Sequence, residues 1–243
     1  MNDRLLTVLE IISSAGPALG PRDIAQRAGL PQATAYRLLS QLQELGLIER
    51  VGIGYRIGHR VLRLALGTVS NTDMRDVIES DLKALADATG ETSFAARLTA
   101  NGIELFVSRL PDEGRSGGVV PPTGLRPVVC SAAKAILAHL PDADRSRLVA
   151  EANLRFPEFS RSEDGAFRQE LAGIVDGSMA TCFGEENPDI GSFATPVMIR
   201  GRKGLFSVGI VGPRTRIEAH WTDLRDPVEA AAQQIARSLD SVA

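Results

Sequence analysis

Apolar residues near the N-terminus recur at the spacing of amphipathic helices. The pattern predicts helices at 2–14, 21–28 and 31–45, and the third has an apolar stripe made of Ala35, Leu38, Leu39, Leu42 and Leu45. Gly29 and Gly46 follow the second and third helices, where a C-terminal cap favours glycine. Short strands are expected at 47–50 and 55–57, because the glycines between them permit the positive φ of a hairpin turn. This order is typical of a helix-turn-helix followed by a wing.

The rest of the chain alternates between helical and strand patterns. Helices are expected at 72–89, 131–140, 142–152, 162–175 and 216–242, and strands at 91–98, 103–110, 180–183, 192–199 and 204–211, with one more opening at Val119 and Val120. Hairpin links between many of these strands predict an α+β fold with an antiparallel sheet. A helical pattern at 60–69 connects this body to the N-terminal part.

Composition and charge narrow the class of protein. With 243 residues, 44% hydrophobic and 23% charged, the chain is a globular protein, and no apolar run approaches the ~20 residues of a membrane span. The N-terminus has no export signal, so a cytoplasmic location is expected. Residues 1–60 hold seven arginines against five acidic residues, whereas the remainder holds 20 basic against 25 acidic residues. A basic N-terminal part on an acidic body is common in a DNA-binding module joined to a sensor.

The predicted third helix has a polar outer face that suits the reading of base edges in the major groove. Candidate DNA-contacting residues are Gln32, Ala33, Thr34, Tyr36, Arg37 and Ser40 on this helix, Arg22 on the second helix, and Arg50 and Arg56 on the wing. The alternative is a helical hairpin that merely packs, because an exposed arginine is usually only solvated.

Several motifs resemble those of the isocitrate lyase regulator (IclR) family. In residues 1–58 the matching motifs are Ile24-Ala25, Gly29-Leu30-Pro31, Thr34-Ala35-Tyr36-Arg37-Leu38-Leu39, Leu45-Gly46-Leu47-Ile48-Glu49 and Tyr55-Arg56-Ile57-Gly58. In the body they are Thr89-Gly90-Glu91-Thr92, Ser131-Ala132-Ala133-Lys134-Ala135-Ile136-Leu137-Ala138, Ala194-Thr195-Pro196-Val197 and Ser207-Val208-Gly209-Ile210-Val211-Gly212-Pro213.

The resemblance implies a transcriptional regulator that binds double-stranded operator DNA and a small-molecule effector. It implies a winged helix-turn-helix at 1–58, a linker helix at 59–71 and a GAF-like effector-binding domain at 72–243. Members of this family are typically dimers or dimers of dimers, so a homodimer or homotetramer is expected.

The candidate effector site lies where a helix begins at Ser131. The N–H groups of its first turn, at Ala132 and Ala133, favour an anion, although Ser131 could instead serve only as the helix cap. The resemblance implies a pocket formed by Leu125, Ser131, Ala132, Cys182, Ser192, Gly209 and Val211. Because the last two replace serines expected there, we expect a carboxylic acid that is larger or more aromatic than a short keto acid.

No catalytic constellation is evident, so an enzyme is not expected, nor is a cofactor or a metal. Cys130, which precedes a helix, is either an activated nucleophile or a buried packing residue. Glu185, Glu186 and Asp189 could attract a metal or form a charged loop. The alternative function is a small-molecule-binding or enzymatic GAF-like protein without specific DNA binding.

Overall fold

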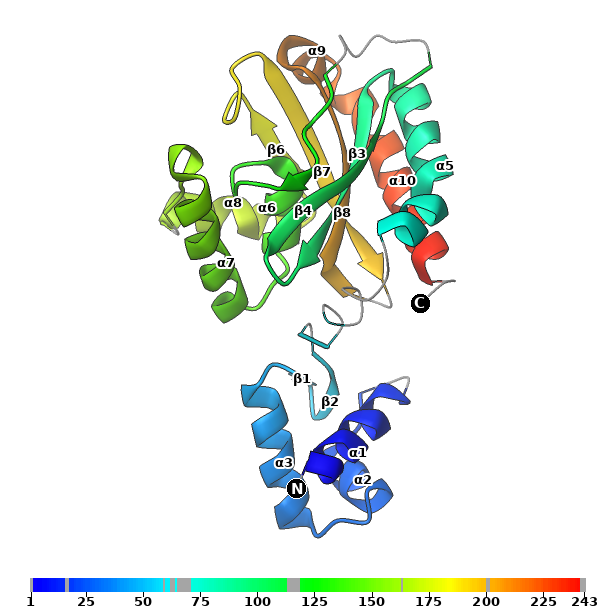
Figure 1. Cartoon of the computed structure of the whole chain (residues 1–243), viewed down its shortest axis with the longest axis vertical. Coiled ribbons are helices and arrows are strands. Elements are labelled where there is room, and N and C mark those ends of the chain that lie inside the picture. The colour runs from blue at the N-terminus through cyan, green and yellow to red at the C-terminus, as the bar shows by residue number, and fades with distance from the viewer. Residues whose placement is uncertain are drawn as a thin grey trace. The chain divides into compact units, whose positions relative to one another are not determined.

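The computed structural model describes residues 2–15, 18–58, 60–61, 64, 71–112, 119–162, 164–199 and 202–240. The chain divides into two compact units, Met1–Thr68 and Val69–Ala243 (Figure 1). Most of the linker helix expected at 59–71 lies outside the described residues. None of the described helices has the length and apolar character needed to cross a bilayer.

Three helices and a two-stranded hairpin form the core of the first unit, as the hydrophobic pattern predicts. Its elements are α1 (Asn2–Ser13), α2 (Pro21–Arg27), α3 (Gln32–Glu44), β1 (Ile48–Val51) and β2 (Gly54–Ile57). Its core gathers buried side chains from all three helices and the hairpin: Val8, Ile12, Leu19, Ile24, Leu38, Leu39, Leu42, Ile48 and Tyr55. Leu19 also exchanges backbone hydrogen bonds with Tyr55, which ties the α1–α2 connection to the wing.

Glycine ends both helices of the helix-turn-helix, as expected. After α2, Gly29 has φ +62° and the Leu30 N–H donates to the Ala25 carbonyl at 3.0 Å. After α3, Gly46 has φ +67° and the Leu47 N–H donates to the carbonyl of Leu42 at 2.9 Å. This six-to-one bond is the Schellman motif, and it needs a residue that tolerates positive φ. The two motifs fix the turn before α3 and the turn after it.

The second unit is built on one antiparallel sheet of six strands in the order β5-β4-β3-β8-β7-β6. The strands are β3 (Thr92–Thr99), β4 (Gly102–Arg109), β5 (Gly124–Leu125), β6 (Ala180–Phe183), β7 (Ile190–Ile199) and β8 (Arg202–Pro213). The helices are α5 (Asn71–Thr89), α6 (Ser131–Leu137), α7 (Asp142–Arg155), α8 (Gly165–Val175), α9 (Arg214–Ala219) and α10 (Trp221–Asp240), with a 3-10 turn, η1, at Pro157–Phe159.

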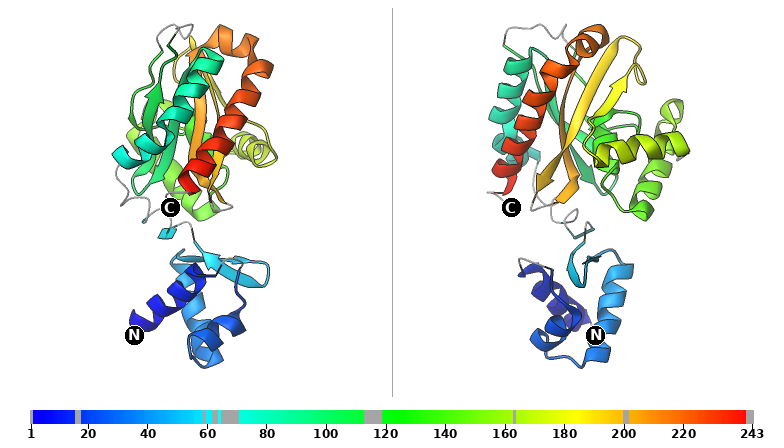
Figure 2. Two further views of the ribbon diagram at one scale, coloured as in Figure 1. Left: turned by 90° about the vertical axis from the view of Figure 1, so that its right-hand side faces the viewer. Right: turned by 180° about the vertical axis from the view of Figure 1, so that it is seen from behind.

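Helices cover both faces of this sheet. Figures 1 and 2 show α5 and α10 side by side against one face, whereas α6, α7 and α8 lie on the other. The first five residues of the central strand β3 are all buried, which indicates that both of its faces are covered. The predicted α+β class with an antiparallel sheet flanked by helices is therefore confirmed.

Three predicted elements differ from the observed ones. The strand expected at Val119 and Val120 is absent from these described residues, and a short strand forms instead at β5. Pro121 and Pro122 follow these valines and have no N–H to donate to a sheet ladder. The helix expected at 131–140 ends at Leu137. The helix expected at 216–242 is split into α9 and α10 by His220, whose backbone has φ −112° and ψ 19°.

Gly209 occupies a place in the sheet with no room for a side chain. It pairs with Phe94 on β3 and with Ala194 on β7. A Cβ at position 209 would lie 2.2 Å from the Phe193 carbonyl oxygen and 2.7 Å from Cζ of Phe94. The glycine therefore lets β7, β8 and the Phe94 ring approach closely.

We expect Gly209→Ala to lower the free energy of unfolding by about 1–3 kcal/mol, because the added methyl group must displace backbone or ring atoms. Gly165→Ala is the matched control, since a Cβ at position 165 would meet nothing within 4 Å. Urea unfolding of the full chain measures both changes. Equal midpoints for the two variants would contradict this account of Gly209.

Candidate functional site

The two faces of α3 differ sharply in exposure. Ala35, Leu38, Leu39 and Leu42 are buried against the first unit's core. The predicted DNA-contacting residues lie on the other side: Gln32, Ala33, Arg37 and Ser40 are exposed, Tyr36 is 50% exposed and Thr34 is partly buried. The first turn of α3 carries no acidic residue. This face can therefore approach a polyanion without like-charge repulsion from its own first turn.

The wing holds its two predicted arginines in different ways. Arg50 is exposed, and its Nε donates to the Gly52 carbonyl at 3.3 Å. Arg56 lies opposite Glu49 in the hairpin register, and its Nε is 2.7 Å from Glu49 Oε1. The charge of Arg56 is therefore already balanced by a carboxylate. Ile53, which sequence analysis did not select, is 86% exposed at the tip of the wing. Arg22 is exposed in the first turn of α2.

The second unit contains a cavity of about 380 Å³ beside the first turn of α6. Five predicted effector residues line it: Ser131, Ala132, Cys182, Ser192 and Val211. The remaining wall combines aromatic and aliphatic side chains with a few polar ones: Phe94, Leu105, Val119, Val120, Pro121, Pro122, Arg126, Pro127, Cys130, Phe156, Glu158, Phe159, Glu186, Asn187 and Ile190. A mainly apolar cavity of this size with few polar groups is typical of a small-molecule site.

Strand register explains why three of these residues meet. Cys182 on β6 lies directly opposite Ser192 on β7, and Ser192 lies opposite Val211 on β8. Residues opposite one another in a sheet point to the same face, so the three form one row across the cavity wall. The hydroxyl groups of Ser192 and Ser131 are hydrogen-bonded at 2.7 Å, which joins this row to α6.

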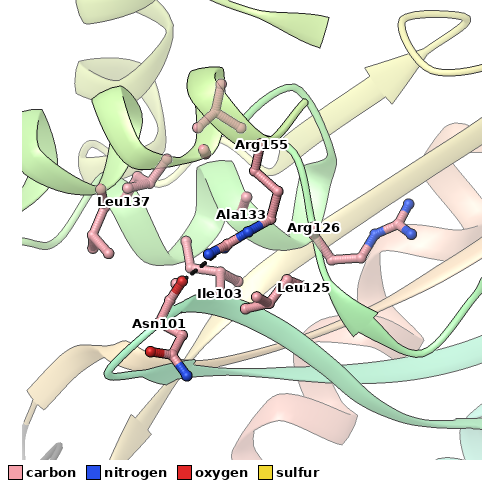
Figure 3. Close-up of a pocket in the computed structure, with 11 residues that line it drawn as sticks. Asn101, Ile103, Leu125, Arg126, Ala133, Leu137 and Arg155 are labelled. Carbon is pink, nitrogen blue, oxygen red and sulfur yellow. Dashed lines mark hydrogen bonds between the residues drawn. The ribbon is translucent and has the colours of Figure 1, made fainter. Parts of the chain in front are cut away.

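Three other predicted effector residues do not line this cavity. Leu125 and Ala133 lie instead at a separate space of about 10 Å³, beside Leu137 and a hydrogen bond from Arg155 to the Asn101 carbonyl (Figure 3). That volume holds about one water molecule. Gly209 is excluded because Phe94 and strand β7 pack where its side chain would be.

The first turn of α6 is capped by Cys130 and not by Ser131. The Ala133 N–H donates to the Cys130 sulfur at 3.4 Å. The interpretation of Ser131 as the cap is therefore wrong. The N–H group of Ala133, expected to receive an anion, already has an acceptor inside the protein.

An ion pair in the cavity wall was not found by sequence analysis. Nη2 of Arg126 lies 2.5 Å from Oε1 of Glu186, and the two side chains are 12% and 24% exposed. Arg126 follows strand β5, whereas Glu186 lies in the turn between β6 and β7. The two residues are 60 positions apart in the sequence, so no local motif predicts that they pair.

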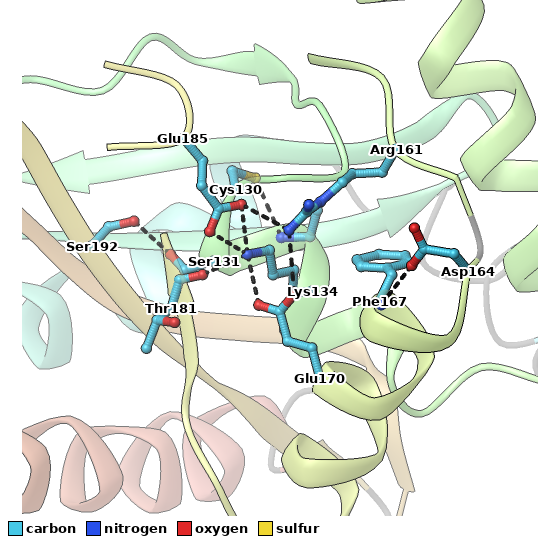
Figure 4. A network of polar contacts seen from close by, with 11 residues as sticks. Cys130, Ser131, Lys134, Arg161, Asp164, Phe167, Glu170, Thr181, Glu185 and Ser192 are labelled. Atoms are coloured by element: carbon cyan, nitrogen blue, oxygen red, sulfur yellow. Dashed lines mark hydrogen bonds and ion pairs between the residues drawn. The ribbon is translucent and has the colours of Figure 1, made fainter. Parts of the chain in front are cut away.

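A second charge network surrounds the buried Lys134. Lys134, on α6, has no exposed surface. Its Nζ contacts the Thr181 carbonyl at 2.9 Å, Glu185 at 2.8 Å and Glu170 at 2.7 Å (Figure 4). Arg161 approaches the same two carboxylates at 3.6 and 3.7 Å. Glu185 and Glu186 thus form the charged loop that sequence analysis considered, and each is paired with a cation.

Both cysteines are buried and have raised pKa values. Burial, and then the nearby Glu186 carboxylate, raise the pKa of Cys130 to about 11. Burial, followed by Glu185 and Glu186, raises the pKa of Cys182 to about 12. A nucleophilic cysteine needs the thiolate form at neutral pH. These environments favour the thiol, so they disfavour the activated-nucleophile interpretation of Cys130.

Known families match both parts of the chain. The IclR helix-turn-helix domain matches residues 3–52, and the C-terminal domain of bacterial transcriptional regulator IclR matches residues 66–237. The chain is 27% identical to the probable transcriptional regulator SauR of Cupriavidus necator over 88% of this chain and 86% of that protein. It is 29% identical to the HTH-type transcriptional regulator TtgV of Pseudomonas putida over 88% and 81%. Both relatives are named as transcriptional regulators, the first of them as a probable one.

Solved structures share the fold. An IclR homolog from Microbacterium hydrocarbonoxydans, complexed with 4-hydroxybenzoate, aligns with a TM-score of 0.59 and 22% identity. The alignment covers 98% of each chain.

We expect the thiols of the folded protein to resist modification by a disulfide reagent at pH 8. A pKa near 11 lowers the thiolate fraction about a hundredfold relative to an ordinary cysteine, and burial blocks access as well. The absorbance of the thiolate that the reagent releases measures the rate of thiol modification, in the folded protein and after unfolding. Ala166→Cys adds an exposed thiol on α8 as the positive control. Native Cys130 and Cys182 reacting as fast as this control would refute their assignment as packing residues.

Proposed function

The chain belongs to the IclR family of bacterial transcriptional regulators, and from this premise we propose that it binds operator DNA through α3 and the wing and senses a small aromatic carboxylic acid. The observation that carries the proposal is the division of α3 into a buried apolar face and an exposed polar face. α3 is the second helix of the helix-turn-helix. Its polar outer face, with no acidic residue in the first turn, suits the major groove of double-stranded DNA.

Each DNA-contacting residue has a chemical role in this proposal. Gln32 and Arg37 make bidentate contacts to base edges, because both present paired polar atoms on the exposed face of α3. Ala33 suits the methyl group of thymine, and Thr34, Tyr36 and Ser40 donate to bases or phosphates. Arg22, Arg50 and Arg56 contact the phosphate backbone, and Arg56 exchanges Glu49 for a phosphate when it does so.

The effector occupies the cavity lined by Ser131, Ala132, Cys182, Ser192 and Val211. Leu125, Ala133 and Gly209 lie outside it and are left out of the proposed site. A volume of about 380 Å³ and three phenylalanine rings in the wall suit an aromatic molecule. The complex of a protein of the same fold with 4-hydroxybenzoate supports this ligand class.

We also infer a GAF-like class for the second unit, on the basis of the family resemblance and the antiparallel sheet with helices on both faces. The regulator then acts in the cytoplasm, where its DNA is.

Substitution of α3 tests the DNA interface. Full-length protein selects its preferred duplex from a random pool, and fluorescence anisotropy then measures binding to that duplex. We expect Arg37→Ala and Gln32→Ala each to weaken binding by about 1–3 kcal/mol and to relax specificity at one base pair. Arg56→Ala is expected to weaken all duplexes alike, and to a smaller extent, because Glu49 already offsets its charge.

Arg168→Ala removes an exposed arginine from α8 in the second unit and is the control for loss of charge. Its affinity for DNA should equal that of the unmodified protein. Unchanged DNA affinity in both the Arg37 and the Gln32 variants would contradict the assignment of α3 as the helix that contacts the bases.

The proposed function also includes an oligomeric state. We propose a homodimer, or a dimer of dimers, in which α1 and the segment 60–69 contact their counterparts; most of 60–69 lies outside the described residues. Joining two weakly basic modules makes the second DNA contact intramolecular and raises the overall affinity. Leu6 on α1 is 58% exposed and offers an apolar contact for this interface.

We expect light scattering to give at least a dimeric mass at micromolar concentration, and Leu6→Glu to shift it towards the monomer. Leu154→Glu changes an 85% exposed leucine on α7 and serves as the control. A monomeric mass for the unmodified protein together with intact DNA binding would rule out this assembly.

A further inference from the structure

Arg126 is a cation held in the wall of an otherwise mainly apolar cavity. Its side chain is 12% exposed, and its neighbours in the wall include Pro122, Pro127 and Cys130. Nη1 donates to the Pro122 carbonyl at 3.4 Å, and Nη2 donates to Glu186 at 2.5 Å. A guanidinium this far from water needs an anionic partner, because an unpaired buried charge is costly.

Glu186 supplies that negative charge and lies in the cavity wall itself. The Cys130 thiol, which also borders Arg126, stays neutral at pH 7 because its pKa is about 11. The carboxylate of Glu186 therefore occupies the place at which the carboxylate of a bound acid would meet the guanidinium. A ligand carboxylate can make the same charge-assisted bonds, and it can take them in the two-pronged geometry that guanidinium groups favour.

The turn that carries Glu186 is anchored independently of Arg126. Gly184 opens this turn with φ +83°, and its N–H donates to the Ile190 carbonyl at 3.1 Å. Glu185, the residue before Glu186, is bound to Lys134 through both carboxylate oxygens at 2.8 Å (Figure 4). Release of Glu186 from Arg126 would thus leave the adjacent carboxylate in place. The exchange needs a movement of one side chain, and Glu186 is already 24% exposed to water.

We propose that Arg126 anchors the carboxylate of the effector and that Glu186 is its internal competitor, displaced when the acid binds. This inference rests on the proposed effector function of the cavity and adds the anchoring residue and the mechanism of ligand selection. The rest of the ligand lies against Phe94, Phe156 and Phe159. A neutral ligand cannot replace Glu186, so the cavity selects monocarboxylic acids over their amides.

The test compares acids with their matched amides by isothermal titration calorimetry on the full chain. The pairs are 4-hydroxybenzoate with 4-hydroxybenzamide, phenylacetate with phenylacetamide, and hexanoate with hexanamide. We expect at least one acid to bind, and to bind at least about tenfold more tightly than its amide. We expect Glu186→Gln to raise the affinity for that acid a further tenfold, or about 1.4 kcal/mol, and to leave the amide unchanged.

Two variants make the test specific. The double variant Arg126→Gln with Glu186→Gln replaces the ion pair by two neutral amides, and its affinity for the acid should fall to that for the amide. Glu229→Gln breaks an Arg–Glu pair on the surface of α10, 40% exposed at the glutamate, and should leave both affinities unchanged.

Several outcomes would overturn the proposal. They are equal binding of acid and amide to the unmodified protein, no gain for the acid in Glu186→Gln, or an acid preference that survives in the double variant. Failure of every acid to bind would overturn it as well. Binding of each variant to the selected DNA duplex is measured in parallel, so loss of the effector hypothesis is distinguished from loss of the DNA-binding function.

Discussion

A lysine ammonium with no exposed surface determines how the second unit is assembled around its cavity. Lys134 can be buried only if the Thr181 carbonyl, Glu170 and Glu185 all reach its Nζ, because removing one partner from a buried ion pair costs several kcal/mol. These partners come from β6, α8 and the turn after β6. The start of α6 at Ser131, three residues before Lys134, is therefore held in one position relative to the sheet.

That fixed helix end and the strand register together produce the cavity. Cys182, Ser192 and Val211 lie in one row because antiparallel pairing sets them opposite one another. Ser131 bonds this row from the helix side. The adjacent acids Glu185 and Glu186 pair with cations on different elements, Lys134 and Arg126, so the turn between β6 and β7 takes part in both the packing of the unit and its cavity.

Local patterns predicted the fold well, and they predicted the cavity in part. The helix ends at Gly29 and Gly46 followed from residue type alone, because only a few residues tolerate positive φ. Gly209 was misjudged, since the reason for a glycine there is the approach of Phe94 and β7, which are distant in the sequence. The pairing of Arg126 with Glu186 was missed for the same reason. Of the nearby residues Gly209 and Val211, only Val211 lines the cavity, and contacts between distant parts of the chain decide this, not propensity or periodicity.

The two Schellman motifs that flank α3 keep this helix folded before the protein binds DNA. Both flanking turns are closed by backbone hydrogen bonds, and the inner face of α3 is already packed on the core. In the proposed complex with DNA, α3 therefore loses no backbone entropy through folding, in contrast to basic segments that fold on contact with a duplex. Encounter with DNA is then limited by orientation and electrostatic attraction, and the heat-capacity change of binding reflects the surface removed from water and not the folding of a helix.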